Sequence, residues 1–142
     1  MPGISETDLD VSAHLAAVEG SGFGAVATFI GRVRDHDPDV SGEVVSLDYS
    51  AHPDAERMLA EIIDGCRARA CDKGTDVAIA ASHRVGHLVV GDIAIVACVA
   101  SAHRAAAFDV CRELVETIKA ELPIWKRQWR ADGAHNWVGL GD

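Results

Sequence analysis

Several familiar targeting and organisational signals are missing from this sequence. No apolar run approaches the ~20 residues that a membrane-spanning helix needs. The first residues, MPGISETDLD, are too acidic and polar for a signal peptide or a transit peptide. The chain contains no internal repeat and no low-complexity tract. We therefore expect a protein of the cytoplasm that does not act in a membrane.

Patterns for metals and disulfides are missing too. The cysteines form no C-x-x-C pair, and we expect each at an apolar position of a helix or strand; they are Cys66, Cys71, Cys98 and Cys111. Structural thiols in a reducing compartment explain them better than a zinc site or a persulfide carrier. The histidines are scattered, and no H-E-x-x-H pattern is present. We expect no metal site.

Positive charge is scarce and unevenly placed. The 142 residues carry a net charge of −9, and residues 1–31 contain no lysine or arginine. Such an acidic protein is a poor match for nucleic acid. Only three lysines occur, and two of them, Lys119 and Lys126, flank Pro123 among apolar neighbours. Residues 101–130 hold six bases against four acids. This local excess indicates a small anionic ligand.

The length suits one domain over residues 1–142. Helical spacing of apolar residues predicts a short helix near 10–18, a second over about 53–73 and a long helix over 102–122. Ser101 is expected to cap the long helix and Pro123 to stop it.

Runs of alternating or continuous apolar residues predict strands. They lie near residues 23–33, 45–49, 77–81, 88–90, 93–100 and 124–129. Residues 35–42 are polar and rich in turn formers, so we expect about 35–43 to be a mobile loop. Interleaved helices and frequent hairpins favour an α+β fold with a mixed or antiparallel sheet.

Basic residues mark both ends of the long helix. His103 and Arg104 stand in its first turn, where free N–H groups favour a phosphate, although an ordinary cap explains them equally. Lys119 falls on the flank of an apolar stripe that includes Phe108. It either snorkels to solvent or lines a partly dry pocket as a proton donor or acceptor. Arg104 and Lys119 lie roughly 22 Å apart on a straight helix, so a shared ligand requires bent packing or a symmetric dimer.

Two further segments carry cations. Phe29-Ile-Gly-Arg-Val-Arg34 ends a buried strand with two arginines that we expect to face the same way, and Gly31 leaves room for a close neighbour. An anion contact and an edge salt bridge both explain these arginines. Lys126 follows Pro123 in an extended segment, with Arg127 on the other face of the strand.

Five segments occur in order and are specific only in combination. They are GAVATFIGRVRDH (24–36), HRVG (83–86), GD (91–92), SAHRAAAF (101–108) and PIWK (123–126). Together they resemble the catalytic (large) subunit family of molybdopterin synthase, over nearly the whole chain from about residue 20.

The resemblance implies a hammerhead-type α+β fold and a homodimer at the core of a heterotetramer. A small ubiquitin-like carrier subunit would dock at each end, with its C-terminal Gly-Gly tail ending in a thiocarboxylate. The activity implied is sulfur transfer from that tail to cyclic pyranopterin monophosphate, which builds the dithiolene of molybdopterin. The sulfur arrives on the partner, so no permanently bound cofactor is implied.

The resemblance also implies roles for individual residues. Lys119 and Lys126 match catalytic lysines, and Phe29 and Val115 match the pocket wall. Gln128 stands where the family commonly has Glu. The residues matched to substrate binding are Arg32, Val33, Arg34, His103, Arg104, Lys119, Lys126, Arg127 and Gln128.

Two other functions use the same residues. One is a Schiff-base lysine enzyme that acts on a phosphorylated carbonyl compound and needs no protein partner. The other is a non-catalytic, anion-binding regulatory dimer. Lysines held in apolar surroundings favour an active enzyme over the second, and borohydride trapping on Lys119 would identify the first.

Overall fold

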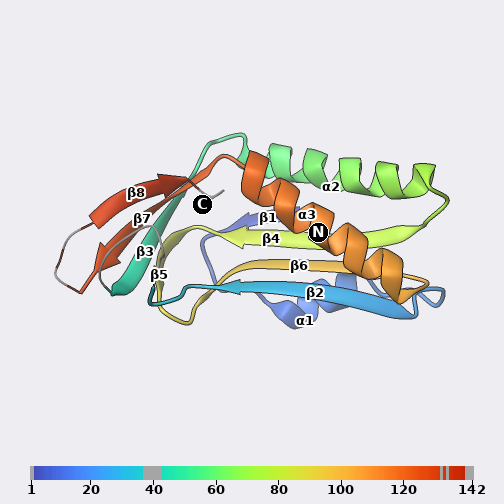
Figure 1. Ribbon diagram of the computed structural model, residues 1–142, viewed down its shortest axis with the longest axis horizontal. Coiled ribbons are helices and arrows are strands. Elements are labelled where there is room, and N and C mark those ends of the chain that lie inside the picture. Colours follow the sequence, from blue (N-terminus) through green and yellow to red (C-terminus); the bar gives the residue numbers. More distant parts are fainter. Residues whose placement is uncertain (1, 37–42, 132, 134, 140–142) are drawn as a thin grey trace.

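The computed structural model describes residues 2–36, 43–131, 133 and 135–139 (Figure 1). Each helix and strand that the sequence predicts is present. In chain order the elements are β1 (Pro2–Ser5), α1 (Val11–Ala17), β2 (Ala25–Arg32), β3 (Val44–Ala51), α2 (Ala55–Asp72), β4 (Val77–Arg84), β5 (Gly86–Val89), β6 (Ile93–Ser101), α3 (Arg104–Glu121), β7 (Ile124–Arg130) and β8 (His135–Gly139). The predicted loop over about 35–43 lies mostly outside the described residues.

The first sheet has the strand order β1-β4-β6-β2. β1 pairs parallel with β4, while β4 and β2 pair antiparallel with β6, so the sheet is mixed. The sequence did not predict β1, because its four residues carry no strand pattern of their own and pair with a segment far along the chain. β4 and β6 are buried along almost their whole length, as expected of central strands covered on both faces.

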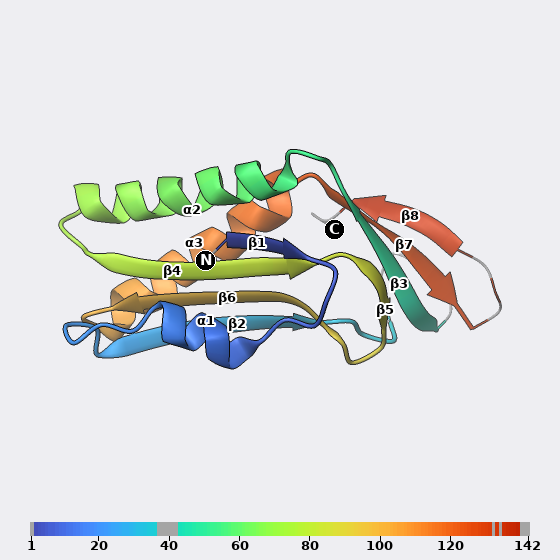
Figure 2. The same cartoon turned by 180° about the vertical axis from the view of Figure 1, so that it is seen from behind.

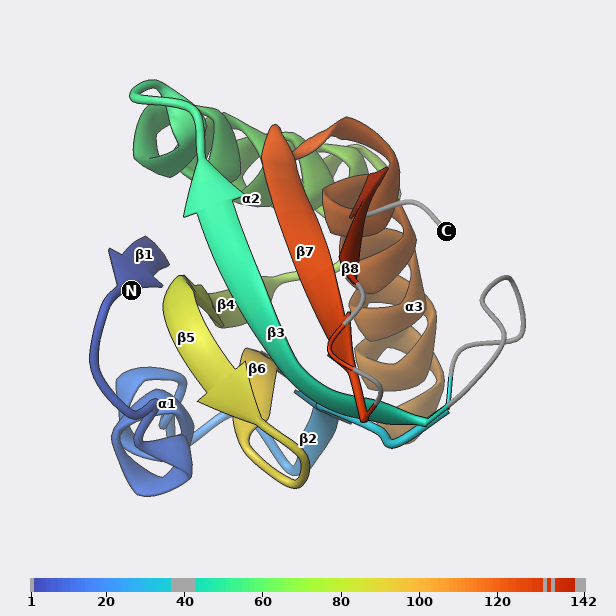
Figure 3. The ribbon, with the colours of Figure 1, turned by 90° about the vertical axis from the view of Figure 1, so that its left-hand side faces the viewer.

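The second sheet has the order β5-β3-β7-β8, with every pair antiparallel. It stands at one end of the first sheet, and Figure 3 faces it directly. One mixed sheet, one antiparallel sheet and three helices confirm the predicted α+β class.

The helices cover the first sheet on both faces. α2 and α3 lie on one face and α1 on the other (Figures 1 and 2). The larger apolar core fills the space between the sheet and α2 and α3, and a smaller cluster packs under α1. Burying these faces supplies the main driving force for the fold. As a result α3 is fixed with its C-terminal end next to the second sheet (Figure 1).

The start of α3 differs from the prediction. His103, not Ser101, is the N-cap residue, and it makes no side-chain capping bond. Ser101 is the last residue of β6 and is buried, and its hydroxyl donates a hydrogen bond to the carbonyl of Asp76 at 3.3 Å. The expected cap was wrong because the strand runs through Ser101. Phe108 also departs from the expected apolar stripe, since it is 66% exposed.

Cys66, Cys98 and Cys111 are buried, as expected of structural thiols, whereas Cys71 is exposed on α2. Within the described part of the chain, no helix combines the length and the apolar character that crossing a membrane requires.

Candidate active site

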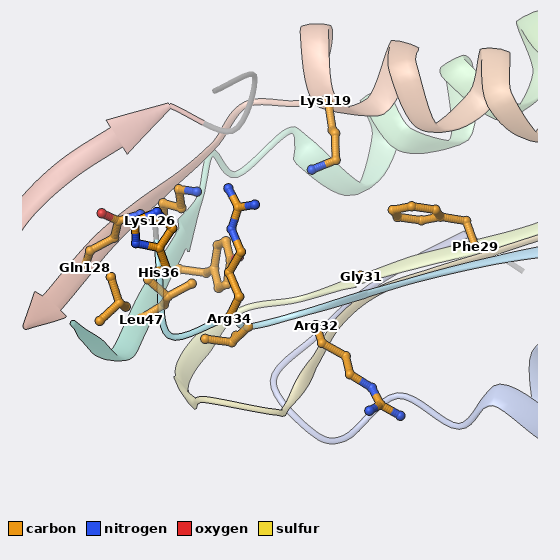
Figure 4. A pocket seen from close by; sticks show the side chains of 12 residues that line it. Phe29, Gly31, Arg32, Arg34, His36, Leu47, Lys119, Lys126 and Gln128 are labelled. Carbon is orange, nitrogen blue, oxygen red and sulfur yellow. The ribbon is translucent and has the colours of Figure 1, made fainter. Parts of the chain in front are cut away.

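A cavity of about 250 Å³ lies where the second sheet meets the C-terminal part of α3 and the end of β2 (Figure 4). Half of the lining residues are apolar, aromatic or glycine, and the other half have basic or amide side chains. The lining residues are Phe29, Gly31, Arg32, Val33, Arg34, His36, Val44, Leu47, Tyr49, Lys119, Lys126 and Gln128.

The two lysines of interest reach this cavity from different elements. Lys119 extends from the last turn of α3, and Lys126 extends from β7, beyond the chain reversal at Pro123. Side chains alternate along a strand, so β7 presents Lys126 and Gln128 to the cavity and turns Arg127 away. The lysines therefore have apolar neighbours because both line one partly apolar cavity.

Arg32 and Arg34 do not face the same way, contrary to the prediction. Arg34 points into the cavity, whereas Arg32 points away from it (Figure 4). A bulge shifts the register of the β2–β6 pair between Gly31 and Arg32, and β2 ends at Arg32, so Arg34 lies beyond the regular alternation of the strand. Val33 is fixed just beyond this bulge, because its N–H donates to the Asp92 carbonyl at 2.9 Å. The strand end is thus rigidly placed.

The lack of a side chain at Gly31 matters for packing. A Cβ atom there would lie 2.5 Å from Cγ2 of Ile95, which is too close for two carbon atoms. The sequence predicts a close neighbour at Gly31, and in the structure that neighbour is the core residue Ile95. Gly31 lets β2 approach β6 closely enough to deliver Val33 and Arg34 to the cavity.

Four of the predicted site residues lie outside the cavity lining: His103, Arg104, Val115 and Arg127. His103 and Arg104 are exposed at the start of α3, at the opposite end of the helix from Lys119. Val115 lines a neighbouring groove between β2 and α3, together with Phe29 and Phe108. Phe29 alone lines both the cavity and the groove.

Arg127 belongs to a cluster on the outer face of the second sheet. Its guanidinium lies 5.0 Å from the ring centroid of Trp129 and 4.8 Å from that of Trp137. Trp129 Nε1 donates to Asp48 Oδ2 at 2.6 Å, and His87 Nδ1 lies 2.7 Å from Asp48 Oδ1. Burial alone would raise the pKa of Asp48, but the hydrogen bonds from Trp129 and His87 outweigh it and lower that pKa. This carboxylate ties β5, β3 and β7 together behind Lys126.

Tyr49 and His36 are site residues that the sequence reasoning missed. Tyr49 faces the cavity because β3 pairs with β7, and such a long-range pairing leaves no local signal. Burial raises the pKa of Tyr49 to about 12, so its phenol keeps its proton. His36 ends the first of the five recognised segments, and that position was the available signal.

His83 lies behind the cavity and contacts Tyr49. The two ring centroids are 5.0 Å apart in an edge-on arrangement. Burial, helped by the positive charge of Lys119, lowers the pKa of His83 to about 4. His83 is thus neutral, and its Nδ1–H donates to the Arg84 carbonyl at 2.7 Å. Tyr49 and His83 together form a neutral wall.

The electrostatics of the cavity favour an anion. Arg34, Lys119 and Lys126 face it, and the lining that the structure describes contains no aspartate, glutamate or cysteine. Cations in a partly apolar cavity bind phosphate and carboxylate groups and stabilise developing negative charge.

The model of the family described as "MoaE protein" matches residues 4–121 of this chain. The chain belongs to the MoaE family. It is 40% identical over 137 residues to molybdopterin synthase catalytic subunit 1 of Mycobacterium tuberculosis, covering 96% of this chain and 88% of that protein.

Solved structures of related proteins share the MoaE fold. The crystal structure of molybdopterin synthase from Staphylococcus aureus superposes with a TM-score of 0.83 and 31% identity, covering 96% of this chain and 95% of that one. A complex of subunits 1 and 2 of molybdopterin-converting factor from Helicobacter pylori gives a TM-score of 0.71 at 21% identity, covering 96% and 88%, and shows the shared fold alone.

Proposed function

We propose that this chain is the catalytic subunit of a molybdopterin synthase. It transfers sulfur from the C-terminal thiocarboxylate of a small ubiquitin-like carrier to cyclic pyranopterin monophosphate, forming the dithiolene of molybdopterin. The observation that carries the proposal is the meeting of Lys119, Lys126 and Arg34 in one partly apolar cavity. Membership of the MoaE family supports it.

The chemistry of the cavity matches both reactants. The cyclic phosphate and the thiocarboxylate are anions, and Arg34, Lys119 and Lys126 present cationic side chains to the cavity. A tetrahedral oxyanion forms as the carrier's thioester breaks down, and the Lys119 and Lys126 ammonium groups are placed to stabilise it. Because the sulfur arrives on the partner, the reaction needs neither a cysteine of this chain nor a permanently bound cofactor.

The apolar half of the lining suits the carrier's tail. Two glycines present only backbone, so a Gly-Gly tail is narrow enough to pass between side chains such as Phe29, Val44 and Leu47. The tail's terminal anion would then meet the lysines. Docking of this kind places the carrier against the end of the molecule formed by the second sheet.

A second copy of the chain would complete the site. β2 is the outer strand of the first sheet, and within the described residues no strand pairs with its free edge. Beside this edge Val26, Ile30 and Phe108 are 48%, 39% and 66% exposed. If two such edges meet about a two-fold axis, the α3 helices run antiparallel across the interface. His103 and Arg104 of one copy then approach Lys119 of the other.

We place the activity in the cytoplasm, in line with the four free cysteines, three of which are buried.

The test is sulfur transfer itself. The purified chain is mixed with thiocarboxylated carrier and cyclic pyranopterin monophosphate, and the dithiolene product is measured. We expect product together with carrier that ends in a carboxylate. Failure to form product, although the carrier binds, would contradict the proposal and favour a regulatory anion-binding dimer.

A further inference from the structure

The cavity contains many proton donors but few groups that accept a proton. Arginine has no free lone pair, and a lysine ammonium has none until it loses its proton. Tyr49 remains protonated, because burial raises its pKa to about 12. Gln128 is an amide and does not ionise. Among the lining residues that the structure describes, His36 is the one that offers a basic imidazole nitrogen.

Gln128 adds no proton acceptor of its own to the cavity. Its side chain is only 2% exposed and faces the cavity from β7, directly opposite Leu47 of β3. A glutamate here would place a carboxylate base in the cavity, but glutamine does not. The lining that the structure describes has no carboxylate that could accept a proton released during the reaction.

His36 is well placed for that task. It follows the Arg34 segment and lies on the side of the cavity lined by Lys126 and Gln128 (Figure 4). The carbonyl of the preceding residue, Asp35, accepts a hydrogen bond from the Val44 N–H at 2.9 Å, which anchors this part of the chain to the start of β3. Its ring is exposed, so water can reach it.

We propose that His36 is the general base that activates water in sulfur transfer. This inference rests on the proposed function, in which the sulfur first joins the carrier's acyl carbon to the pterin as a thioester. The oxygen of water bonds to the acyl carbon while His36 takes one of its protons. The C–S bond then breaks, and sulfur keeps the electron pair as a thiolate on the pterin. The carrier leaves as a carboxylate, and the second proton passes to solvent.

The remaining groups of the cavity have different tasks. Arg34, Lys119 and Lys126 present positive charge to the cavity, and Tyr49 supplies a neutral hydroxyl. The lysines and Arg34 stabilise the oxyanion and the departing thiolate. His36 thus accepts the proton from water, and the cations stabilise the negative charge that develops on the substrate.

The test is a single-turnover assay of the full chain with thiocarboxylated carrier and cyclic pyranopterin, comparing wild type with His36→Ala. A general base contributes typically 10²–10⁴-fold, so we expect thioester hydrolysis to slow by about 10²-fold or more. The covalent carrier–pterin adduct should accumulate and be visible by mass spectrometry. Carrier affinity should change by less than about two-fold, because binding relies on other groups.

Two further readouts separate a base from a structural residue. Added imidazole should restore hydrolysis by His36→Ala in proportion to its concentration. The rate of wild type should fall toward acidic pH, and that of the variant should not. His52→Ala is the matched control, because His52 is half exposed and lies outside the cavity lining. It should match wild type in rate and in pH profile.

Three outcomes would overturn the inference. One is a His36→Ala rate equal to wild type. Another is a loss of rate that imidazole does not restore, with the acidic fall unchanged. The third is slow transfer without any adduct, which would place the defect before hydrolysis. In each case wild type still transfers sulfur and the proposed function stands. If wild type forms no product, the proposed function fails first and the inference fails with it.

Discussion

Lys126 of β7 lies directly opposite Tyr49 of β3, so both side chains emerge on the face of the second sheet that borders Lys119. This pairing joins residues 77 positions apart in the sequence. It brings a cation next to a phenol that keeps its proton. The site therefore depends on the β3–β7 register as much as on the long helix.

The pKa of Tyr49 is open to direct measurement, because it is the only tyrosine of the chain. The alkaline change in absorbance near 295 nm thus reports this phenol alone. We expect a midpoint at about pH 12 in the folded protein. The same titration in denaturant should return to about 10, the value for an unperturbed tyrosine. A folded midpoint near 10 would show that the ring is solvated and would contradict the described wall.

Stability should fall as the pH drops from about 6.5 to 4, because of His83. In the folded chain His83 remains neutral down to about pH 4, whereas in the unfolded chain it takes a proton near pH 6.5. The unfolded state thus binds more protons in this window, so acid favours unfolding. Between pH 7 and pH 5 the loss should be about 2 kcal/mol.

The check is urea unfolding at both pH values and a fixed protein concentration. His83→Gln should be less stable than wild type at pH 7 but should lose much less on acidification. His52→Gln, at an exposed position, should keep the acid sensitivity of wild type. Equal sensitivity in His83→Gln would assign the effect to another group.

Gly31→Ala should destabilise the fold and weaken the site. The added methyl would lie 2.5 Å from Ile95 Cγ2, so β2 must shift away from β6. Overpacking of this kind costs about 1–3 kcal/mol. Gly22→Ala is the control, because a Cβ there meets nothing within 4 Å, and it should change stability by less than about 0.5 kcal/mol. Equal denaturation curves for the two variants would show that the β2 bulge tolerates a side chain.

Mixing two damaged chains tests the shared site. Arg104→Ala and Lys119→Ala should each be nearly inactive alone. After subunit exchange, a mixed dimer has one site with both changes and one with neither. Statistical exchange should thus restore about a quarter of wild-type sulfur transfer. Native mass spectrometry would verify the mixed dimers, and their inactivity would show that no site combines Arg104 of one copy with Lys119 of the other.

The sequence predicts the elements of this fold well, because helical and alternating patterns are local. Prediction from sequence failed at residues whose position depends on contacts between segments that are distant in the sequence. Ser101 resembles a helix cap in the sequence, but β6 runs through it. Arg34 lies beyond the last residue of β2, so it does not follow the strand alternation that was expected to align it with Arg32. Phe108 is exposed because the β2 edge beside it is open.

The candidate site was predicted to a similar extent. Lys119, Lys126 and Arg34 were found because basic residues in apolar segments stand out in an acidic chain. Tyr49 was not, since a tyrosine in an alternating strand reads as an ordinary core residue. His103 and Arg104 belong to a recognised sequence segment, but within one chain they lie far from the cavity. They reach a cavity only in the proposed symmetric dimer, where the cavity belongs to the other copy.

Lys119 is expected to act in sulfur transfer, and substitution of single lysines shows whether it does. Dithiolene formation from thiocarboxylated carrier and cyclic pyranopterin is compared among wild type, Lys119→Ala and Lys73→Ala. Lys73 is the remaining lysine, exposed at the end of α2 and outside the cavity lining. We expect Lys73→Ala to match wild type and Lys119→Ala to lose at least about 10²-fold in rate while folding normally. Equal rates for all three chains would contradict the account.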